Sequence, residues 1–171
     1  ANVDCFYFES PYVDAVGTHE IENAHETILG PANGREVSSS GNFSNRAAIG
    51  GLNTWEADGR AYTTTYVNAK NAGTYTLKLK YSLECGMDTR IDYRINGDTD
   101  RDWRSWTLKD HSSSWDEVKE FTTTVSLKKG INAIDITGAV NTGTDWKWVR
   151  LDNFELSYVS ENNYSKKAFS S

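Results

Sequence analysis

Strict alternation of apolar and polar side chains constrains this chain more than any other feature of its sequence. Tyr75, Leu77, Leu79 and Tyr81 occupy every second position, and Thr or Lys fills the positions between them. Successive side chains of a β-strand point to opposite faces, so this pattern predicts a strand with one face against a core. The segment 71–73, which contains Asn and Gly, predicts a turn before it.

The same alternation recurs along the chain, and turn-forming residues separate the alternating segments. Strands are predicted at 61–67, 74–81, 91–95, 121–127, 133–137 and 149–159, an edge strand at 5–8, and a strand or a mixed segment at 21–29. Loops are predicted at 30–45, 53–60, 82–90, 96–115 and 138–148. Roughly eight or nine strands without intervening helices predict an all-β fold, an antiparallel β-sandwich of the jelly-roll type.

Length and charge limit the classes of partner. The 171 residues suit one sandwich domain at 19–159, with an N-terminal extension at 1–18 and a C-terminal tail or linker at 160–171. A net charge of −6 argues against nucleic acids and anionic membranes, because both attract basic surfaces. No apolar run approaches the length of a membrane span.

Tryptophan is abundant, and it lies beside polar residues in segments predicted as loops. An aromatic ring can cover the apolar face of a sugar while planar polar side chains bind its hydroxyls. The candidate sugar contacts are Asn53, Trp55, Trp103, Trp106, Trp115, Trp146 and Arg150. The alternative is that these rings fill the ends of the sandwich, and we expect about half of the Trp residues to be structural.

Paired carboxylates in the segment Glu20-Ile21-Glu22 are a candidate metal site. On a strand both would project to one face, where they repel each other unless a cation or a proton intervenes. Oxygen ligands favour calcium, and Asp152 is a further candidate ligand. The alternative is a solvated acidic edge paired with Arg35 or Arg46.

The order and spacing of several short segments resemble carbohydrate-binding modules of families 6 and 35 and their relatives, among them the galactose-binding family 62. The matching segments are 20–24, 48–52, 72–77, 95–97, 125–132 and 151–156, within residues 19–158. The resemblance implies a jelly roll with a structural calcium. It implies Glu20, Glu22 and Asp152 as ligands, completed by a backbone carbonyl near Asn45 or Arg46.

The resemblance also implies a sugar site in the loops at one end of the sandwich. Trp115 corresponds to an aromatic residue of the family site. Arg150 stands where the family often carries Asn, and this departure favours acidic sugars or paired hydroxyls, or else a structural salt bridge.

These observations predict a non-catalytic module that binds plant or microbial polysaccharide or oligosaccharide. We expect it to be secreted and monomeric, and to target an attached glycan-active enzyme within a larger multi-domain protein. No catalytic motif marks the chain, so an enzyme is not expected. The alternatives are a small glycan hydrolase or lyase on the same fold, and a cell-surface adhesion domain. Cys5 and Cys85 form either a disulfide or two separate thiols.

Overall fold

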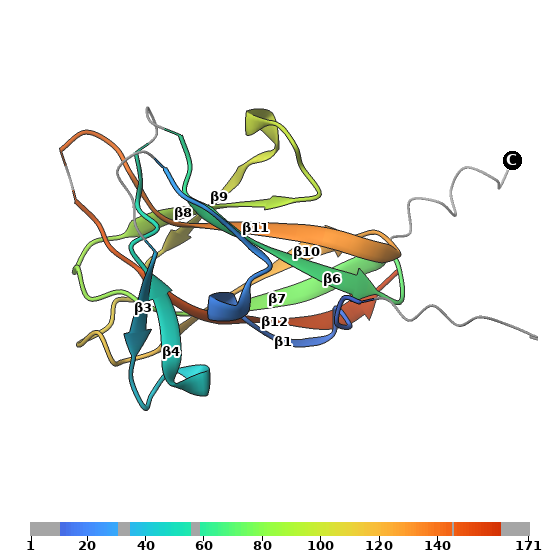
Figure 1. Ribbon diagram of the computed structural model, residues 1–171, viewed down its shortest axis with the longest axis horizontal. Helices are drawn as coiled ribbons and strands as arrows, with labels where there is room; N and C mark the ends of the chain where they lie inside the picture. Colours follow the sequence, from blue (N-terminus) through green and yellow to red (C-terminus); the bar gives the residue numbers. More distant parts are fainter. Residues whose placement is uncertain (1–10, 31–34, 56–58, 145, 162–171) are drawn as a thin grey trace, which may run out of the picture.

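A computed structural model of the chain consists of two β-sheets packed face to face (Figure 1). The structure describes residues 11–30, 35–55, 59–144 and 146–161. The predicted all-β antiparallel sandwich is confirmed. No helix within those ranges is long and apolar enough to cross a membrane.

Strands supply almost all of the regular structure. One sheet contains β1 (Gly17–Glu20), β3 (Glu36–Ser39), β4 (Ala47–Gly50), β7 (Gly73–Ser82), β10 (Lys119–Leu127) and β12 (Arg150–Ser160). The other contains β2 (Glu26–Ile28), β5 (Thr54–Trp55), β6 (Tyr62–Ala69), β8 (Thr89–Ile95), β9 (Arg104–Leu108) and β11 (Gly130–Asn141). Short 3₁₀ helices form at η1 (Ile21–Asn23), η2 (Ser44–Arg46) and η3 (Asp100–Asp102).

The strand order brings distant segments together. The first sheet runs β10–β7–β12–β4–β3, with β1 also paired to β12, and the second runs β2–β6–β11–β8–β9. These pairings are antiparallel, whereas the short β5 adds to β11 in parallel. The first and last described strands are therefore neighbours, and β12 pairs with β1, β4 and β7.

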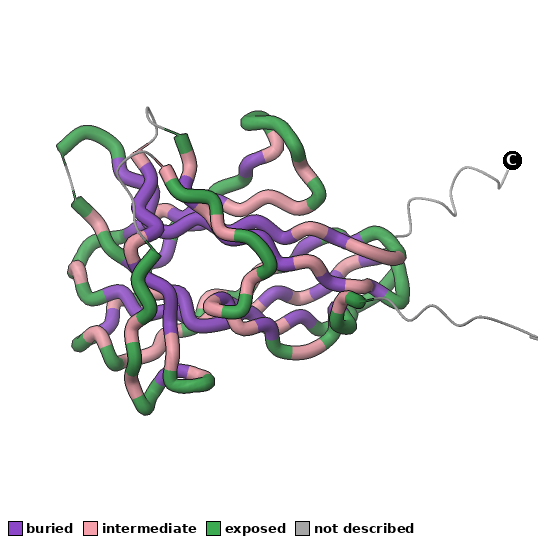
Figure 2. Tube along the Cα trace, in the orientation of Figure 1, coloured by how far each residue is buried: buried purple, intermediate pink, exposed green. Residues whose placement is uncertain are grey.

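The core lies between the sheets, where Figure 2 shows the buried parts of the trace. Tyr75, Leu77, Leu79 and Tyr81 of β7 are all fully buried, as their alternation predicts. Buried tyrosine needs a partner for its hydroxyl. The Tyr75 hydroxyl donates to the Asn71 carbonyl over 2.7 Å, and that of Tyr81 donates to a loop carbonyl. Both rings therefore fill the core without an unpaired polar atom.

Several predicted loops contain strands. Segment 30–45 contains β3, 53–60 contains β5, 96–115 contains β9, and β11 continues beyond 137 to Asn141. The extension of β11 was hidden because its register shifts between Ile136 and Ala139 and interrupts the alternation. Gly138 sits within this irregularity, where a Cβ atom would collide with the Leu52 backbone.

Residues 20–22 differ from the prediction that Glu20 and Glu22 lie on one face of a strand. β1 ends at Glu20, and η1 follows, so Glu20 and Glu22 do not share one strand face. Ile21 is nevertheless buried, as expected. Segment 21–29 is mixed, which was one of the two predicted alternatives: it begins with η1 and contains β2 near its end. Cys5 and the edge strand expected at 5–8 lie outside the described residues; Cys85 is half-buried.

Candidate functional site

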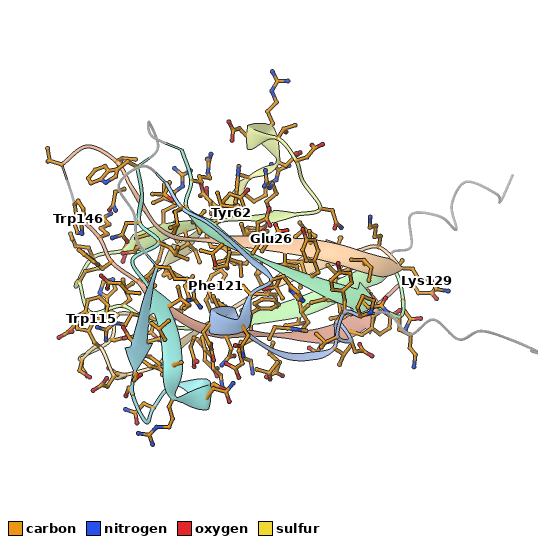
Figure 3. The ribbon with its side chains drawn as sticks, viewed as in Figure 1. Glu26, Tyr62, Trp115, Phe121, Lys129 and Trp146 are labelled. Atoms are coloured by element: carbon orange, nitrogen blue, oxygen red, sulfur yellow. The ribbon has the colours of Figure 1, made fainter. Side chains whose placement is uncertain are left out.

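A pocket of about 290 Å³ opens among the loops at one end of the sandwich. Figure 3 shows Trp115 and Trp146 at this end, and Lys129 at the other. The pocket is lined by Glu36, Gly50, Gly51, Trp115, Trp148, Val149 and Arg150. It therefore combines two tryptophan rings, one cation and one carboxylate from three separate segments.

Buried hydroxyls hold the loop that carries Trp115. The Ser82 hydroxyl, at the end of β7, donates to the Trp115 carbonyl over 2.8 Å. Ser112 and Leu83 are linked twice: the Leu83 N–H donates to the Ser112 hydroxyl, and the Ser112 N–H donates to the Leu83 carbonyl. The loop before β10 is thus fixed to the sheet, so Trp115 is placed before any ligand binds.

Arg150 lies over the Trp115 ring, with its guanidinium carbon 4.8 Å from the ring centroid. Arg150 begins β12 and pairs with Ser82, the residue that also anchors the Trp115 loop. Gly50 lies beside the arginine stem, because a Cβ there would be in ordinary van der Waals contact with the Arg150 Cγ, at 3.7 Å. A guanidinium stacked on a ring is held by cation–π attraction and keeps its N–H edge available as a donor.

Further tryptophan rings adjoin the pocket. Trp148 packs against Trp146, and Trp146 packs against Trp55. Trp55 and Trp146 were predicted as sugar contacts, and the structure brings them together. Trp148 was missed as a candidate, although its alternation with Trp146 along an extended segment placed both rings near one another. Glu36 was missed because nothing in its local sequence distinguishes it.

Three of the predicted sugar contacts lie apart from this pocket. Trp106 is a core residue on β9, 5% exposed, and it stacks on Tyr93. Asn53 is 3% exposed, so its side chain is inaccessible to a ligand. Trp103 is nearly buried beneath Arg94 and packs on Tyr62. Asn53 and Trp103 lie outside strands, as the sequence predicted, whereas Trp106 lies in β9. Their burial places all three side chains away from the pocket lining.

The predicted metal ligands meet at a second place, around Ser44 of η2. The Ser44 hydroxyl donates to Glu20 Oε1 over 2.5 Å, and the Ser44 N–H donates to Asp152 at 3.0 Å. Asn45 and Arg46, with positive φ of 47° and 60°, form the tight bend that follows. The Arg46 carbonyl accepts the Ser40 N–H over 3.2 Å, so it already serves the β3–β4 hairpin.

The carboxylates at this place are poorly compensated. Glu20 Oε2 and both carboxylate oxygens of Glu22 are buried without a hydrogen-bond partner in the described part of the chain. Burial, with the nearby charges of Glu20 and Glu22, raises the pKa of Asp152 to about 6, although the Ser44 N–H opposes this. Burial and the Glu20 charge also raise the pKa of Glu22. Such orphaned oxygens are the chemistry a hard cation requires.

The unpartnered carboxylate oxygens are the evidence for a cation site, because the described side chains do not form a complete set of metal ligands. Among the described residues, no three His, Cys, Asp or Glu side chains are arranged as a metal-binding group. A calcium ion here would need backbone and water oxygens beside the carboxylates, as calcium sites usually have. An open hollow of about 510 Å³ adjoins Asp152 and Ser44, and its aromatic lining residue, Phe43, is buried.

Solved structures with the same fold include carbohydrate-binding modules and enzymes that act on glycans. A family 35 carbohydrate-binding module from Clostridium thermocellum matches with a TM-score of 0.64 and 17% identity, over 82% of this chain and 98% of that one. An exo-β-1,3-galactanase from Phanerochaete chrysosporium matches at 0.62 and 19%, over 84% of this chain. A Podospora anserina β-(1,4)-mannanase with a family 35 module matches at 0.59 and 18%, over 85%.

The chain spans only 30% of the galactanase and 28% of the mannanase. Searches of protein-family models and of curated proteins found no match. The similarity therefore establishes the fold: this chain is a β-sandwich of the carbohydrate-binding-module type, as the sequence predicted.

Proposed function

We propose that this domain is a non-catalytic carbohydrate-binding module whose ligand enters the pocket formed by Trp115, Trp148 and Arg150. The observation that carries the proposal is one pocket in which the Arg150 guanidinium, stacked on Trp115, offers a row of donors beside the exposed ring of Trp148. Sugars present an apolar C–H face and a hydroxyl edge, so this arrangement complements both. Glu36 adds an acceptor on the pocket wall.

Binding without cleavage is the role we propose. Glu36 is the carboxylate that the described part of the chain contributes to the pocket lining, whereas a glycosidase holds two carboxylates across the scissile bond. The module would raise the local concentration of an attached enzyme on its polysaccharide. With that role we propose a secreted parent protein of several domains.

We also propose a structural calcium at Glu20, Glu22 and Asp152. The support is the set of buried carboxylate oxygens without partners, which a divalent cation would satisfy. The ion would supply positive charge between the first and last strands, and the protein would supply the oxygen ligands.

A glycan array with the wild-type protein and R150M tests the sugar site. Wild-type protein should bind a defined set of glycans, and R150M should lose at least about tenfold in affinity, the loss of one charged contact. Lys129→Met is the matched control, because it removes an exposed cation from the opposite end (Figure 3). Equal binding by R150M and wild type, or release of new reducing ends from bound polysaccharide, would contradict the proposal.

A further inference from the structure

Three tryptophan rings form a continuous surface beside the pocket, which we call the tryptophan shelf (Trp55, Trp146 and Trp148). The ring centroids of Trp55 and Trp146 are 5.5 Å apart, and those of Trp146 and Trp148 are 5.4 Å apart. Trp146 is 48% exposed and Trp148 is 39% exposed. Because Trp148 also lines the pocket, the shelf continues the pocket wall outward.

One buried residue holds the shelf in place. Asn141, 1% exposed at the end of β11, accepts the Lys147 N–H at 2.8 Å and donates to the Lys147 carbonyl at 3.3 Å. Lys147 stands between Trp146 and Trp148 in the chain, so this clamp positions both rings. Asn141 also pairs with Trp55 through the β5–β11 ladder. The rings are thus fixed before binding, which lowers the entropic cost of a contact.

Exposed tryptophan rings that contact one another indicate a binding surface, since contiguous exposed apolar patches mark interaction sites whereas single exposed apolar residues do not. We propose that the tryptophan shelf binds a glycan chain that continues from the sugar in the pocket. This inference rests on the proposed function and specifies its ligand: a chain of several sugar units rather than a single terminal sugar. The spacing between neighbouring rings is comparable with the length of one pyranose unit.

The ring planes restrict the shape of that chain. Trp55 and Trp146 are inclined by 62°, and Trp146 and Trp148 by 42°. A flat crystalline surface can touch several rings at once only when those rings are coplanar. The shelf therefore fits a single soluble chain that twists from unit to unit, and not the face of a crystalline polysaccharide.

Calorimetry with oligosaccharides of increasing length tests the shelf. The probes are the monosaccharide to the tetrasaccharide of β-1,3-galactan, β-1,4-mannan and α-1,6-glucan. For the series that binds, wild-type affinity should rise about tenfold or more from monosaccharide to trisaccharide, in line with the energy of stacking on one aromatic ring. W146A should lose this rise while its monosaccharide affinity stays within about twofold of wild type.

Two other variants separate the shelf from the pocket. R150M should weaken every length of chain equally, because it alters the pocket alone. Y158A is the control for removing an exposed aromatic ring, since Tyr158 is 38% exposed near the far end of β12. Y158A should keep the wild-type dependence on chain length.

Several results would overturn the proposal that the tryptophan shelf binds a glycan chain. If W146A keeps the wild-type length dependence, the shelf makes no contact with the chain, although the pocket proposal stands. If sedimentation shows a wild-type dimer that W146A abolishes, the shelf is an interface between copies. If Trp146 is needed to retain the protein on crystalline cellulose, the twisted-chain ligand is wrong. If wild type binds no sugar, the pocket and the shelf fail together.

Discussion

The clearest division at the scale of single residues is between tryptophans that fill the core and tryptophans that face solvent. Trp106 belongs to the core: its ring lies 3.8 Å from that of Tyr93 at an interplanar angle of 16°, and it also packs against Phe121. Its indole Nε1 is buried without a hydrogen-bond partner among the described residues. The side chain therefore contributes packing and carries the cost of one unsatisfied donor.

Trp106→Phe should be tolerated because two effects oppose each other. The smaller ring leaves a void, which destabilises, but the change also removes the buried donor, which stabilises. We expect W106F to lose less than about 1.5 kcal/mol of unfolding free energy, and W106A to lose about 3–5 kcal/mol. Urea unfolding measures both. Sugar binding by folded W106F should match wild type; loss of binding with the stability retained would return Trp106 to the site.

At the scale of strands, the most constrained group is Asp92 on β8, whose side chain is fully buried. It accepts the Arg90 Nε–H over 2.7 Å, the Arg60 Nε–H over 3.0 Å and the Ser105 hydroxyl over 2.7 Å. These contacts join β8 to β9 and to the segment before β6. Burial alone would raise the pKa of Asp92, but hydrogen bonds from Arg90, Ser105 and Arg60 outweigh it and lower the pKa below 3.8.

The lowered pKa fixes the direction of a pH effect. The folded state holds the Asp92 proton less tightly than the unfolded state, so the stabilisation is complete above the unfolded pKa, near 3.8, and is lost as pH falls through the folded pKa. D92N removes the charge and should cost about 2–3 kcal/mol of unfolding free energy at pH 7. The gap between D92N and wild type should narrow below about pH 4.

Urea unfolding at neutral and acid pH measures this gap. D98N is the matched control, because Asp98 is exposed on the loop after β8. D98N should keep the wild-type free energy of unfolding at pH 7, because Asp98 is exposed. A gap between D92N and wild type that stays constant down to pH 3 would show that Asp92 does not titrate as described.

The comparison of strands shows what the sequence can predict. β7 alternates over its whole length and faces a buried core, so its boundaries were predicted almost unchanged. β3, β5 and β9 are short, and their polar residues resemble loop sequence. Within β9, only Trp106 and Leu108 are buried. Two buried positions are too few for a periodic signal, so their pairing partners decide the structure.

The types of residue that line the candidate site could be predicted from the sequence, but the individual residues could not. The sequence indicated Trp and Arg as sugar contacts, because their chemistry suits sugars. It could not separate Trp115 from Trp106, since both lie next to polar residues and only long-range packing decides which ring is buried. Trp115 and Arg150 meet through Ser82, which is distant from both in sequence. Contacts of this kind depend on strand order, which local patterns leave open.

At the scale of the whole molecule, one cluster of carboxylates lies where the first and last described strands meet. Glu20 ends β1 and pairs with Asn153 of β12, while Asp152 accepts the Ser44 N–H from a position 108 residues away in the chain. Without a cation these buried carboxylates repel one another. A bound ion would convert that repulsion into attraction across three segments, so its effect should appear in the stability of the entire domain.

Calcium removal should therefore lower the melting temperature of the whole sandwich in one step. An ion present at about a hundred times its dissociation constant stabilises by about 2.7 kcal/mol. For a domain of this size that corresponds to roughly 5–10 °C. Calorimetry should show this shift when calcium replaces chelator. Magnesium should give a smaller shift, because it loses its water ligands less readily.

Glu22→Gln separates a calcium effect from a general loss of stability. Neither carboxylate oxygen of Glu22 has a hydrogen-bond partner in the described structure, so E22Q removes charge without breaking a contact. In chelator, E22Q should melt at or above the wild-type temperature, because one repelling charge is gone. Calcium should raise the melting temperature of E22Q only slightly. The control is E155Q, which changes a glutamate on β12; calcium should raise its melting temperature as much as that of wild type. If calcium raised the melting temperature of E22Q and wild type equally, the ion would bind elsewhere. The buried carboxylates would then avoid mutual repulsion only by taking up protons.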